Sequence, residues 1–515
     1  MSSVGTVYLV GAGPGDPGLL TLRGQECLQR ADLVLYDGLV NPLILRHAHG
    51  VAKRTARSTG PDGRRLDQAE INRQLIDAAR AGQTVVRLKG GDPLIFGRGA
   101  EEAAALKAAG IPFEIVPGIT AAAAAGAYAG FSFTHRETSS AVAFVTGHED
   151  PSKPVALLDY AALARFPGTL VFYMGLHRVA AIADALIAHG KPPCTPAAVV
   201  ARAATSQQRT VVSTLDRLAA DTASAELQPP SVIIIGDVIA QRGELVWYER
   251  RPLLGRRIGI TRPDAQADAV IARCLELGAE PILMPLIQIL PPDDWRAVDE
   301  KLDQLDQYDW LVFTSVNGVE QFLGRLWARG QDTRRLGHIR LAAIGASTAD
   351  ALAARQLRAD VVPESFRAEA LAAALVPHVK GQRLLWARAS RGRDVLPEML
   401  RAAGAAVDEV VAYQNVDLER LPEPASSLLE SGALQWVGLS SPTIARRLAA
   451  LLSPAARVHV GRSVRLAAIS PVTAEAAAEA GLPVSAVASV YTWDGLLDAI
   501  VAADSKSTRE RDSPV

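Results

Sequence analysis

The sequence predicts an α/β protein with largely parallel sheets. Apolar runs of four to eight residues alternate with alanine-rich helical stretches along the chain, and short strands separated by helices are typical of β–α units. At roughly 100–200 residues per domain, the 515 residues predict about three to five domains. Hydrophobic residues make up 49% and charged residues 21% of the chain, which excludes a mostly disordered protein.

Charge and cysteine content narrow the class of protein further. The chain has 54 Lys+Arg and 55 Asp+Glu, a net charge of −1, and a nucleic-acid-binding protein would show a basic excess. The three cysteines, Cys27, Cys194 and Cys274, lack the paired spacing of a disulfide framework or a zinc site. No segment has the ~18 uninterrupted apolar residues of a membrane span. We therefore expect a cytoplasmic protein without a metal, a nucleic-acid partner or a membrane partner.

The first half contains a series of predicted strands that end in Gly, Pro or Asp. Ligands of open α/β sheets bind at the carboxyl ends of strands, so we expect functional residues in the loops that follow. A last pair of strands is expected within 231–249. The other predicted strands lie within 7–10, 32–37, 84–93, 113–118, 141–147 and 169–175.

A short linker is predicted at 249–255, a polar segment with one proline and one glycine. All seven tryptophans lie at position 247 or later, which indicates that two modules of different origin meet here. The polar residues 504–515 are expected to form a disordered tail. Between linker and tail, strands are predicted within 256–264, 309–315, 340–345, 382–389, 407–413, 436–441 and 465–470.

A glycine-rich turn, Gly11 to Gly18, follows the first strand and precedes a helix from about Thr21. Glycines let the backbone approach a ligand and direct N–H groups at it. Asp37 follows about 20 residues later, as an acid does in dinucleotide sites. The spacing is GxGxG instead of GxGxxG, and Pro14 cannot donate an N–H. A dinucleotide-dependent oxidoreductase is therefore the least favoured function for this chain.

Several longer motifs follow one another in the first half. They are VGAGPGDPGLLT with ADLVLYDGLV, VVRLKGGDPLIFGRGAEE, VPGITAAAAAGAYAG with THRE, TGHE, YMG and TPAAVVARAAT. In this order they resemble the uroporphyrinogen-III C-methyltransferases of the tetrapyrrole methylase family. The resemblance covers roughly 4–248 and assigns residues 1–248 to this module. It implies two α/β subdomains with S-adenosylmethionine in the cleft between them, usually in a homodimer. The implied reaction transfers methyl groups to C2 and C7 of uroporphyrinogen III and gives precorrin-2.

The same resemblance assigns roles to individual residues. Asp37 matches the family's base, which takes a proton from a pyrrole N–H. Lys53 matches a lysine assigned as proton donor, and its alternative is a solvated surface lysine. Met174 has a gap-filling core residue as its alternative. The residues placed around the cofactor are Pro14, Gly90, Gly91, Asp92, Ile95, Thr120, Ala121, Met174 and Ala203.

Basic residues are expected at the mouth of this cleft, because the tetrapyrrole carries acetate and propionate groups. One group clusters in a single loop-like stretch, and a second flanks the motifs. For each residue the alternative is a solvated surface charge. The candidates are Lys53, Arg54, Arg57, Arg64, Arg65, Arg87, Lys89, Arg98 and Arg136.

From residue 256 onward the sequence shows no catalytic triad, metal spacing or phosphate loop. It contains the short motifs GITRPDAQ, FTSVNGVEQF, AAIGASTADAL, VAYQ, SSPTIAR and AAISPVTAEAAAEAGL with YTWDGLLDAI. Taken together, these motifs resemble uroporphyrinogen-III synthase over 256–503. The resemblance implies one lobe from 256–290 plus 413–503 and another from 291–412. The implied reaction closes hydroxymethylbilane with inversion of the last ring and loss of water.

Tyr413 matches the family tyrosine proposed to assist departure of the hydroxyl. Its alternative is a strand-end tyrosine packed at the lobe junction. Small hydrogen-bonding side chains at strand ends suit the substrate's carboxylates, although helix capping explains serine and threonine there equally well. The candidate substrate-binding residues are Arg262, Thr314, Ser315, Asn317, Ser440, Ser441, Ser470 and Thr473.

Together the two resemblances predict a bifunctional enzyme on the way to sirohaem or cobalamin. The second half would make the tetrapyrrole that the first half methylates. The alternative is a methyltransferase whose second half is a non-catalytic tetrapyrrole-binding or regulatory module.

Overall fold

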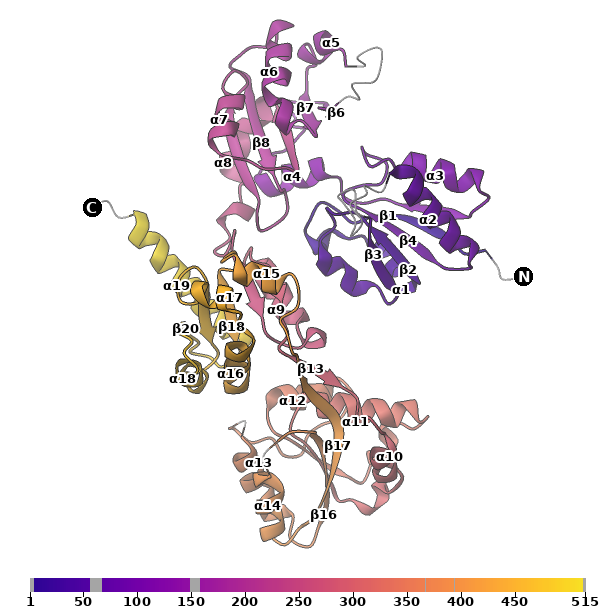
Figure 1. Ribbon diagram of the computed structural model, residues 1–515, viewed down its shortest axis with the longest axis vertical. Coiled ribbons are helices and arrows are strands. Elements are labelled where there is room, and N and C mark those ends of the chain that lie inside the picture. The colour runs from indigo at the N-terminus through magenta and orange to yellow at the C-terminus, as the bar shows by residue number, and fades with distance from the viewer. Residues whose placement is uncertain (1–3, 56–66, 149–157, 366, 393, 513–515) are drawn as a thin grey trace. The chain divides into compact units, whose positions relative to one another are not determined.

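A computed structural model describes residues 4–55, 67–148, 158–365, 367–392 and 394–512 (Figure 1). It contains four sheets of five strands each, so the α/β class predicted from the sequence is confirmed. The described chain forms two compact units. The first runs to Arg257 and includes Ala272–Pro281 and the residues from Asp504, and the second holds Ile258–Ile271 and Ile282–Ala503. Within the described residues, no helix combines the length and apolarity needed to cross a membrane.

The first sheet is fully parallel, as expected. Its central strands alternate side chains between two apolar layers. The hydroxyl of Thr21 caps the first helix by accepting from Gly24 N, and Asp67 caps the second by accepting from Glu70 N. In spatial order the strands are β3 (Val51–Arg54), β2 (Leu33–Tyr36), β4 (Val85–Lys89), β1 (Val7–Gly11) and β5 (Phe113–Val116). Its helices are α1 (Leu22–Arg30), α2 (Gln68–Arg80) and α3 (Gly99–Ala108).

The second sheet is mostly antiparallel, which corrects the expectation of largely parallel sheets. Only β6 and β7 run parallel, while β10 is antiparallel to both β7 and β8, and β8 to β9. A short loop joins β8 to β9, and such a loop permits only antiparallel pairing. In spatial order the strands are β6 (Val142–Thr146), β7 (Thr169–Tyr173), β10 (Ser231–Ile235), β8 (Pro196–Ala201) and β9 (Arg209–Thr214).

Helices cover both faces of the second sheet. Buried alanines of α4 (Ala121–Ala129) pack on one face, beside Val171 and Tyr173. The opposite face packs against α6 and α7. The segment 231–249 holds one strand instead of the expected pair, because Gly236 turns the chain at φ +152° and short helices follow. The remaining helices are α5 (Tyr160–Ala164), α6 (Val179–Ala188), α7 (Leu218–Ser224) and α8 (Arg242–Leu245).

The predicted linker is firmly attached to the first unit. Gly255 N donates to Ser206 O at 2.8 Å, and Leu253 N donates to Leu277 O at 2.9 Å. Just before it, Trp247 Nε1 donates to Ala127 O at 2.8 Å. The segment 249–255 is thus held by backbone hydrogen bonds at its carboxyl end.

The third sheet combines strands from both ends of the second half. In spatial order they are β12 (Glu280–Leu283), β11 (Arg257–Ile260), β18 (Trp436–Leu439), β19 (Arg465–Ala468) and β20 (Val484–Val487). The helices of this region are α9 (Asp268–Glu276), α15 (Ala425–Glu430), α16 (Pro442–Leu451), α17 (Pro454–His459), α18 (Pro471–Glu479) and α19 (Trp493–Asp512).

Helix α19 corrects the expectation of a disordered tail from residue 504. Its buried residues Leu496, Leu497 and Ile500 anchor the helix, and helical structure continues to Asp512. Asp504 is itself buried, and its Oδ2 lies 2.7 Å from Arg256 Nε. The ion pair of Asp504 with Arg256 therefore involves the first residue of the segment that we expected to be disordered.

The fourth sheet includes β13 (Ile287–Leu290). We expected this segment in the lobe formed by 256–290 and 413–503. This strand pairs antiparallel with the carboxyl end of the long strand β17, with Leu290 opposite Gln414 (Figure 1). In spatial order the strands are β13 (Ile287–Leu290), β17 (Ala406–Asp417), β16 (Arg383–Ala389), β14 (Trp310–Phe313) and β15 (Arg340–Ala343). The helices are α10 (Arg296–Asp303), α11 (Val316–Ala328), α12 (Ala346–Ala353), α13 (Ala368–Leu375) and α14 (Val395–Ala402).

Asp408 of β17 connects three elements around this sheet. Its Oδ2 accepts from Tyr308 Oη at 2.5 Å, Lys301 Nζ at 3.0 Å and Arg383 Nη2 at 3.0 Å. Burial raises the pKa of Asp408, but these hydrogen bonds outweigh it and bring the pKa to about 2. The folded state therefore prefers the ionised carboxylate more strongly than the unfolded chain does.

We predict that Asp408→Asn lowers the free energy of unfolding at pH 7 by about 1–2 kcal/mol, after allowance for partial solvent exposure. Because the folded pKa is depressed, the stability difference from the wild type is full above the unfolded pKa near 4 and disappears as pH falls through about 2. Urea unfolding at several pH values measures it. Asp303→Asn, at a 57% exposed carboxylate that pairs with Arg329, should change stability little. An equal loss in both variants would contradict the prediction.

Candidate active sites

Three loops meet at the carboxyl edge of the first sheet. Gly13 and Gly91 exchange backbone hydrogen bonds, with N···O distances of 3.2 and 2.7 Å. A Cβ on Gly118 would lie 2.3 Å from Gly91 O, so this contact leaves no room for a side chain. The structure thus brings the turn of Pro14 beside that of Gly90 and Gly91, as the sequence expected.

Gly91 lies directly in front of the amino end of α4. It has φ +70°, and a Cβ there would come into van der Waals contact with this helix end, 3.7 Å from Ala121 N. Thr120 and Ala121 lie at this helix end. A ligand with a carboxylate suits this place, because glycine lets a ligand approach the backbone closely and a helix amino end favours negative charge.

Asp92 fixes the turn that follows Gly91. Its Oδ1 accepts from Leu94 N at 2.8 Å, and its Oδ2 accepts from Gly118 N at 3.0 Å. Ile95 comes next and packs against the core on the α4 face of the second sheet. Asp92 therefore orders the loop through both of its oxygens.

Loops of the second sheet contribute the remaining predicted cofactor residues. Tyr173 Oη lies 2.6 Å from Thr120 Oγ1 and accepts from Ala122 N at 3.1 Å, which ties the end of β7 to α4. The next residue, Met174, is 54% exposed with φ +56°. This exposure excludes the core gap-filling alternative for Met174. Ala203 O would lie 3.5 Å from a Cβ on Gly15, so its loop adjoins the turn of Pro14.

Asp37 directly follows β2 and is bound from the neighbouring strand. Arg87 Nη2 of β4 donates to Asp37 Oδ1 at 2.5 Å, and Thr55 Oγ1 donates to the same oxygen at 3.1 Å. The Arg87 side chain is fully buried, whereas 26% of the Asp37 side chain is exposed. The protein therefore holds Asp37 in place from inside while leaving part of its side chain exposed to solvent.

Glu102 of α3 completes a buried group of charges that the sequence analysis did not predict. Its Oε1 accepts from Arg87 Nε at 3.1 Å, Lys89 Nζ at 2.9 Å and Gln68 Nε2 at 3.0 Å. Its Oε2 is buried without a partner among the described residues. Burial lowers the pKa of Lys89, and the neighbouring Arg87 lowers it further. The sequence feature that could have indicated this buried group is a pair of charges, at positions 87 and 89, in an otherwise apolar strand.

Arg87 and Lys89 were expected among the basic residues at the mouth of the cleft. That expectation was wrong, because both side chains are buried. Lys53 and Arg54 lie on exposed β3, and a Cβ on Gly38 would lie 2.6 Å from Arg54 Nη2. Arg54 therefore lies beside the residue that follows Asp37. Arg98 pairs with Glu101 at 2.6 Å and Arg136 is exposed, whereas Arg57, Arg64 and Arg65 lie outside the described residues.

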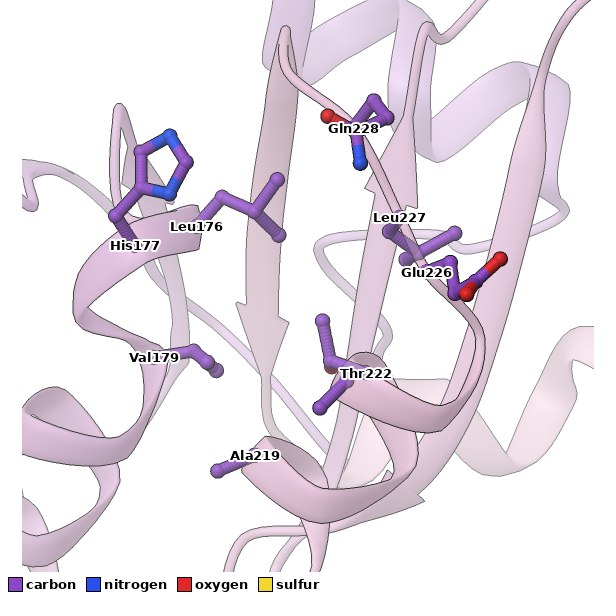
Figure 2. A pocket seen from close by; sticks show the side chains of 9 residues that line it. Leu176, His177, Val179, Ala219, Thr222, Glu226, Leu227 and Gln228 are labelled. Carbon is purple, nitrogen blue, oxygen red and sulfur yellow. The ribbon is translucent and has the colours of Figure 1, made fainter.

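A hollow of about 680 Å³ lies apart from these loops (Figure 2). Leu176, His177 and Val179 line one wall, and α7 with the loop after it lines the other. The lining includes none of the cofactor residues predicted from the sequence. Thr222 Oγ1 is buried there without a partner among the described residues. The hollow therefore lies outside the predicted site.

In the second half, Tyr413 lies beside the residues that follow β14. It is only 4% exposed, and its hydroxyl donates to Ser315 Oγ at 2.9 Å. Ser315 Oγ in turn caps α11 by accepting from Gly318 N, and Trp386 Nε1 donates to Thr314 Oγ1 at 3.0 Å. Burial raises the pKa of Tyr413, although its bonds to Ser315 and Asn317 lower it. The phenol therefore keeps its proton at neutral pH.

The loop after β11 contacts the amino end of α11, where the predicted residue Asn317 lies. Gln266 Nε2 donates to Asn317 Oδ1 at 2.5 Å, which joins the loop after β11 to the amino end of α11. Arg262, in that same loop, is half-buried with no hydrogen bond or ion pair to another described residue. Burial lowers its pKa. A partly desolvated guanidinium without a partner favours binding of a carboxylate.

The remaining candidates follow β18 and β19. Ser441 Oγ accepts from Ile444 N at 3.3 Å, and Ser470 Oγ accepts from Thr473 N at 3.3 Å. Both serines thus cap helices that start with proline, which is the structural alternative given above. Thr473 is buried, and Ser440 is half-buried beside Ser441.

Comparisons with known proteins match two families to successive parts of the chain. The family model of tetrapyrrole (corrin/porphyrin) methylases matches residues 6–219, and that of uroporphyrinogen-III synthase HemD matches residues 268–498. The porphyrin biosynthesis protein HemD of Ruminiclostridium josui is 32% identical over 96% of this chain and 98% of that protein. The chain belongs to both families. Its first half is a methylase half and its second a synthase half.

Further relatives match the methylase half. The uroporphyrinogen-III C-methyltransferase of Bacillus subtilis is 38% identical over 64% of this chain and 68% of that protein. A solved structure of uroporphyrin-III C-methyltransferase from Thermus thermophilus, complexed with S-adenosylhomocysteine, is 41% identical and covers 46% of this chain and 99% of that one, with a TM-score of 0.40.

We predict that Arg87→Met destabilises the methylase half by about 3–5 kcal/mol, because it leaves the buried Glu102 carboxylate with one cation fewer. Denaturant unfolding measures the loss. Arg23→Met removes an exposed arginine that pairs with Glu26 and Glu114 and should have little effect. Similar losses in the two variants would show that burial of the Arg87 guanidinium does not increase its effect on the free energy of unfolding.

Proposed function

We propose that this protein cyclises hydroxymethylbilane to uroporphyrinogen III in its synthase half and methylates that product at C2 and C7 in its methylase half. The product is precorrin-2. The observation that carries this proposal is the full-length similarity to one porphyrin biosynthesis protein, together with both family models in one chain. A non-catalytic second half is not favoured, because its sequence matches the synthase family over 268–498.

S-adenosylmethionine supplies the methyl groups to the methylase half. Gly90 and Gly91 place no side chain between it and the backbone, and Thr120 and Ala121 offer it the amino end of α4. The contacts among these loops support one binding site for the predicted residues. The others proposed to hold it are Pro14, Asp92, Ile95, Met174 and Ala203.

Asp37 acts as the base of methyl transfer. When a pyrrole carbon of the substrate gains a methyl group, the ring must lose a proton, and the N–H proton passes to the Asp37 carboxylate. Arg87 and Thr55 both bind Oδ1, which orients the carboxylate toward the cleft. Lys53 lies on the neighbouring strand, with its Cα paired to that of Leu35, and we assign it the role of proton donor.

The synthase half mainly positions a flexible substrate. The linear substrate loses its hydroxyl as water, and its electron-rich pyrroles stabilise the cation that forms, so the protein must fold the chain and place a proton donor. Tyr413, kept protonated by burial, is that donor in our proposal. Arg262 and Asn317 bind carboxylates, as do Thr314, Ser315, Ser440, Ser441, Ser470 and Thr473.

We further propose a homodimer formed through the methylase half and a cytoplasmic location. The family resemblance supports the homodimer. The free cysteines Cys27, Cys194 and Cys274 support a reducing compartment.

Asp37→Asn is expected to slow methylation by about a hundredfold or more, because the amide cannot accept the pyrrole proton. S-adenosylmethionine affinity should stay unchanged. Methyl transfer to uroporphyrinogen III, with cofactor binding by calorimetry, tests both points. Asp32→Asn, at the opposite end of β2, is the matched control. Near-normal turnover of Asp37→Asn would remove Asp37 from this role.

Tyr413→Phe is expected to slow cyclisation of hydroxymethylbilane at least about tenfold, because the donated proton is lost. Methylation of supplied uroporphyrinogen III should not change. Tyr308→Phe, which removes a buried tyrosine hydroxyl bonded to Asp408, is the matched control and should leave both rates unchanged. If Tyr413→Phe cyclises at the wild-type rate, Tyr413 is a packing residue.

A further inference from the structure

Left-handed backbone is concentrated in the loops that carry the predicted cofactor residues. In the described chain, seven residues other than glycine have positive φ. Five of them lie in the three loops that hold Ile95, Met174 and Ala203, and this conformation is unfavourable for residues with a Cβ. Strain of this kind collects at ligand-binding sites. The five are Phe96, Arg98, Met174, Arg202 and Ala204.

Phe96 is the least expected of these residues, because bulky side chains rarely adopt φ +52°. Its ring is 42% exposed, and its centroid lies 4.9 Å from that of Tyr173 at an interplanar angle of 52°. Phe144 lies on another edge of Tyr173, with centroids 5.9 Å apart, and is 38% exposed. An aromatic group thus spans from the loop after β4 to β6, and part of it stays open to solvent.

The loop that carries Phe96 is rigid. Asp92 binds Leu94 N and Gly118 N, and a Cβ on Gly97 would lie 2.6 Å from Pro93 O. Side-chain rearrangement therefore cannot easily relieve the strain or hide the ring. An exposed, strained and rigidly held ring is unfavourable in the free protein, and contact with an apolar part of a ligand would compensate for it.

We propose that Phe96 is a substrate-binding residue whose ring contacts a pyrrole ring of the tetrapyrrole in the methylase cleft. This rests on the proposed methyl transfer. The turn of Gly90 and Gly91, assigned to the cofactor, lies within the same loop, so the ring stands beside the site of methyl transfer. Tetrapyrrole rings are apolar and aromatic at their faces, and aromatic side chains pack well against such rings. The carboxylates at the periphery stay available to basic residues.

The test is a Phe96→Gly variant of the full-length protein, assayed with supplied uroporphyrinogen III. Glycine relieves the left-handed strain while removing the ring. We expect KM for uroporphyrinogen III to rise roughly tenfold, S-adenosylmethionine affinity to stay within about twofold, and the melting temperature not to fall. Phe96→Leu, which keeps apolar bulk, should fall between the wild type and Phe96→Gly. Glu226→Gly is the control, because Glu226 also has positive φ, +50°, but lies outside the cleft.

Three results would overturn the proposal. An unchanged KM in Phe96→Gly would show that the ring does not contact the substrate. A cofactor affinity that falls as much as KM rises would assign the ring to S-adenosylmethionine. A lower melting temperature with a KM change equal to that of Glu226→Gly would make Phe96 a packing residue. If the wild type itself transfers no methyl group, the proposed function fails and this inference with it, an outcome distinct from all three.

Discussion

The buried charges around Glu102 are the interaction on which the methylase site depends. A central strand of a parallel sheet is normally apolar, yet β4 carries Arg87 and Lys89 in full burial. Such charges are tolerated only when paired, so α3 must supply Glu102 and the end of β2 must supply Asp37. The pairing fixes one helix and two strands relative to each other. It also places Asp37, the proposed base, next to the glycine turn proposed to hold the cofactor.

Unlike the methylase site, the candidate site of the synthase half depends little on charged side chains. Its candidate residues are mostly neutral hydroxyls and amides at strand ends, connected by bonds such as that from Tyr413 to Ser315. This suits a reaction in which the substrate stabilises its own charge and the protein controls conformation. The one clear charge is Arg262, whose lack of a described partner leaves it available to an anionic substrate.

The α/β class, the positions of most strands along the chain and the gathering of the glycine loops could be predicted from the sequence, because periodicity and turn residues act locally. Pairing between distant segments could not. The antiparallel second sheet, the place of β13 beside β17 and the ion pair of Asp504 with Arg256 depend on contacts that no local pattern encodes. Arg87 looked like a rim residue for the same reason, since its partner Glu102 lies on another element.

The central claim is that one chain makes uroporphyrinogen III and methylates it. The most direct measurement is incubation of the purified protein with hydroxymethylbilane and S-adenosylmethionine under anaerobic conditions, followed by mass spectrometry and isomer analysis of the product. The account predicts a dimethylated type III tetrapyrrole from the single protein. Accumulation of unmethylated uroporphyrinogen I, the product of closure without ring inversion, would contradict it.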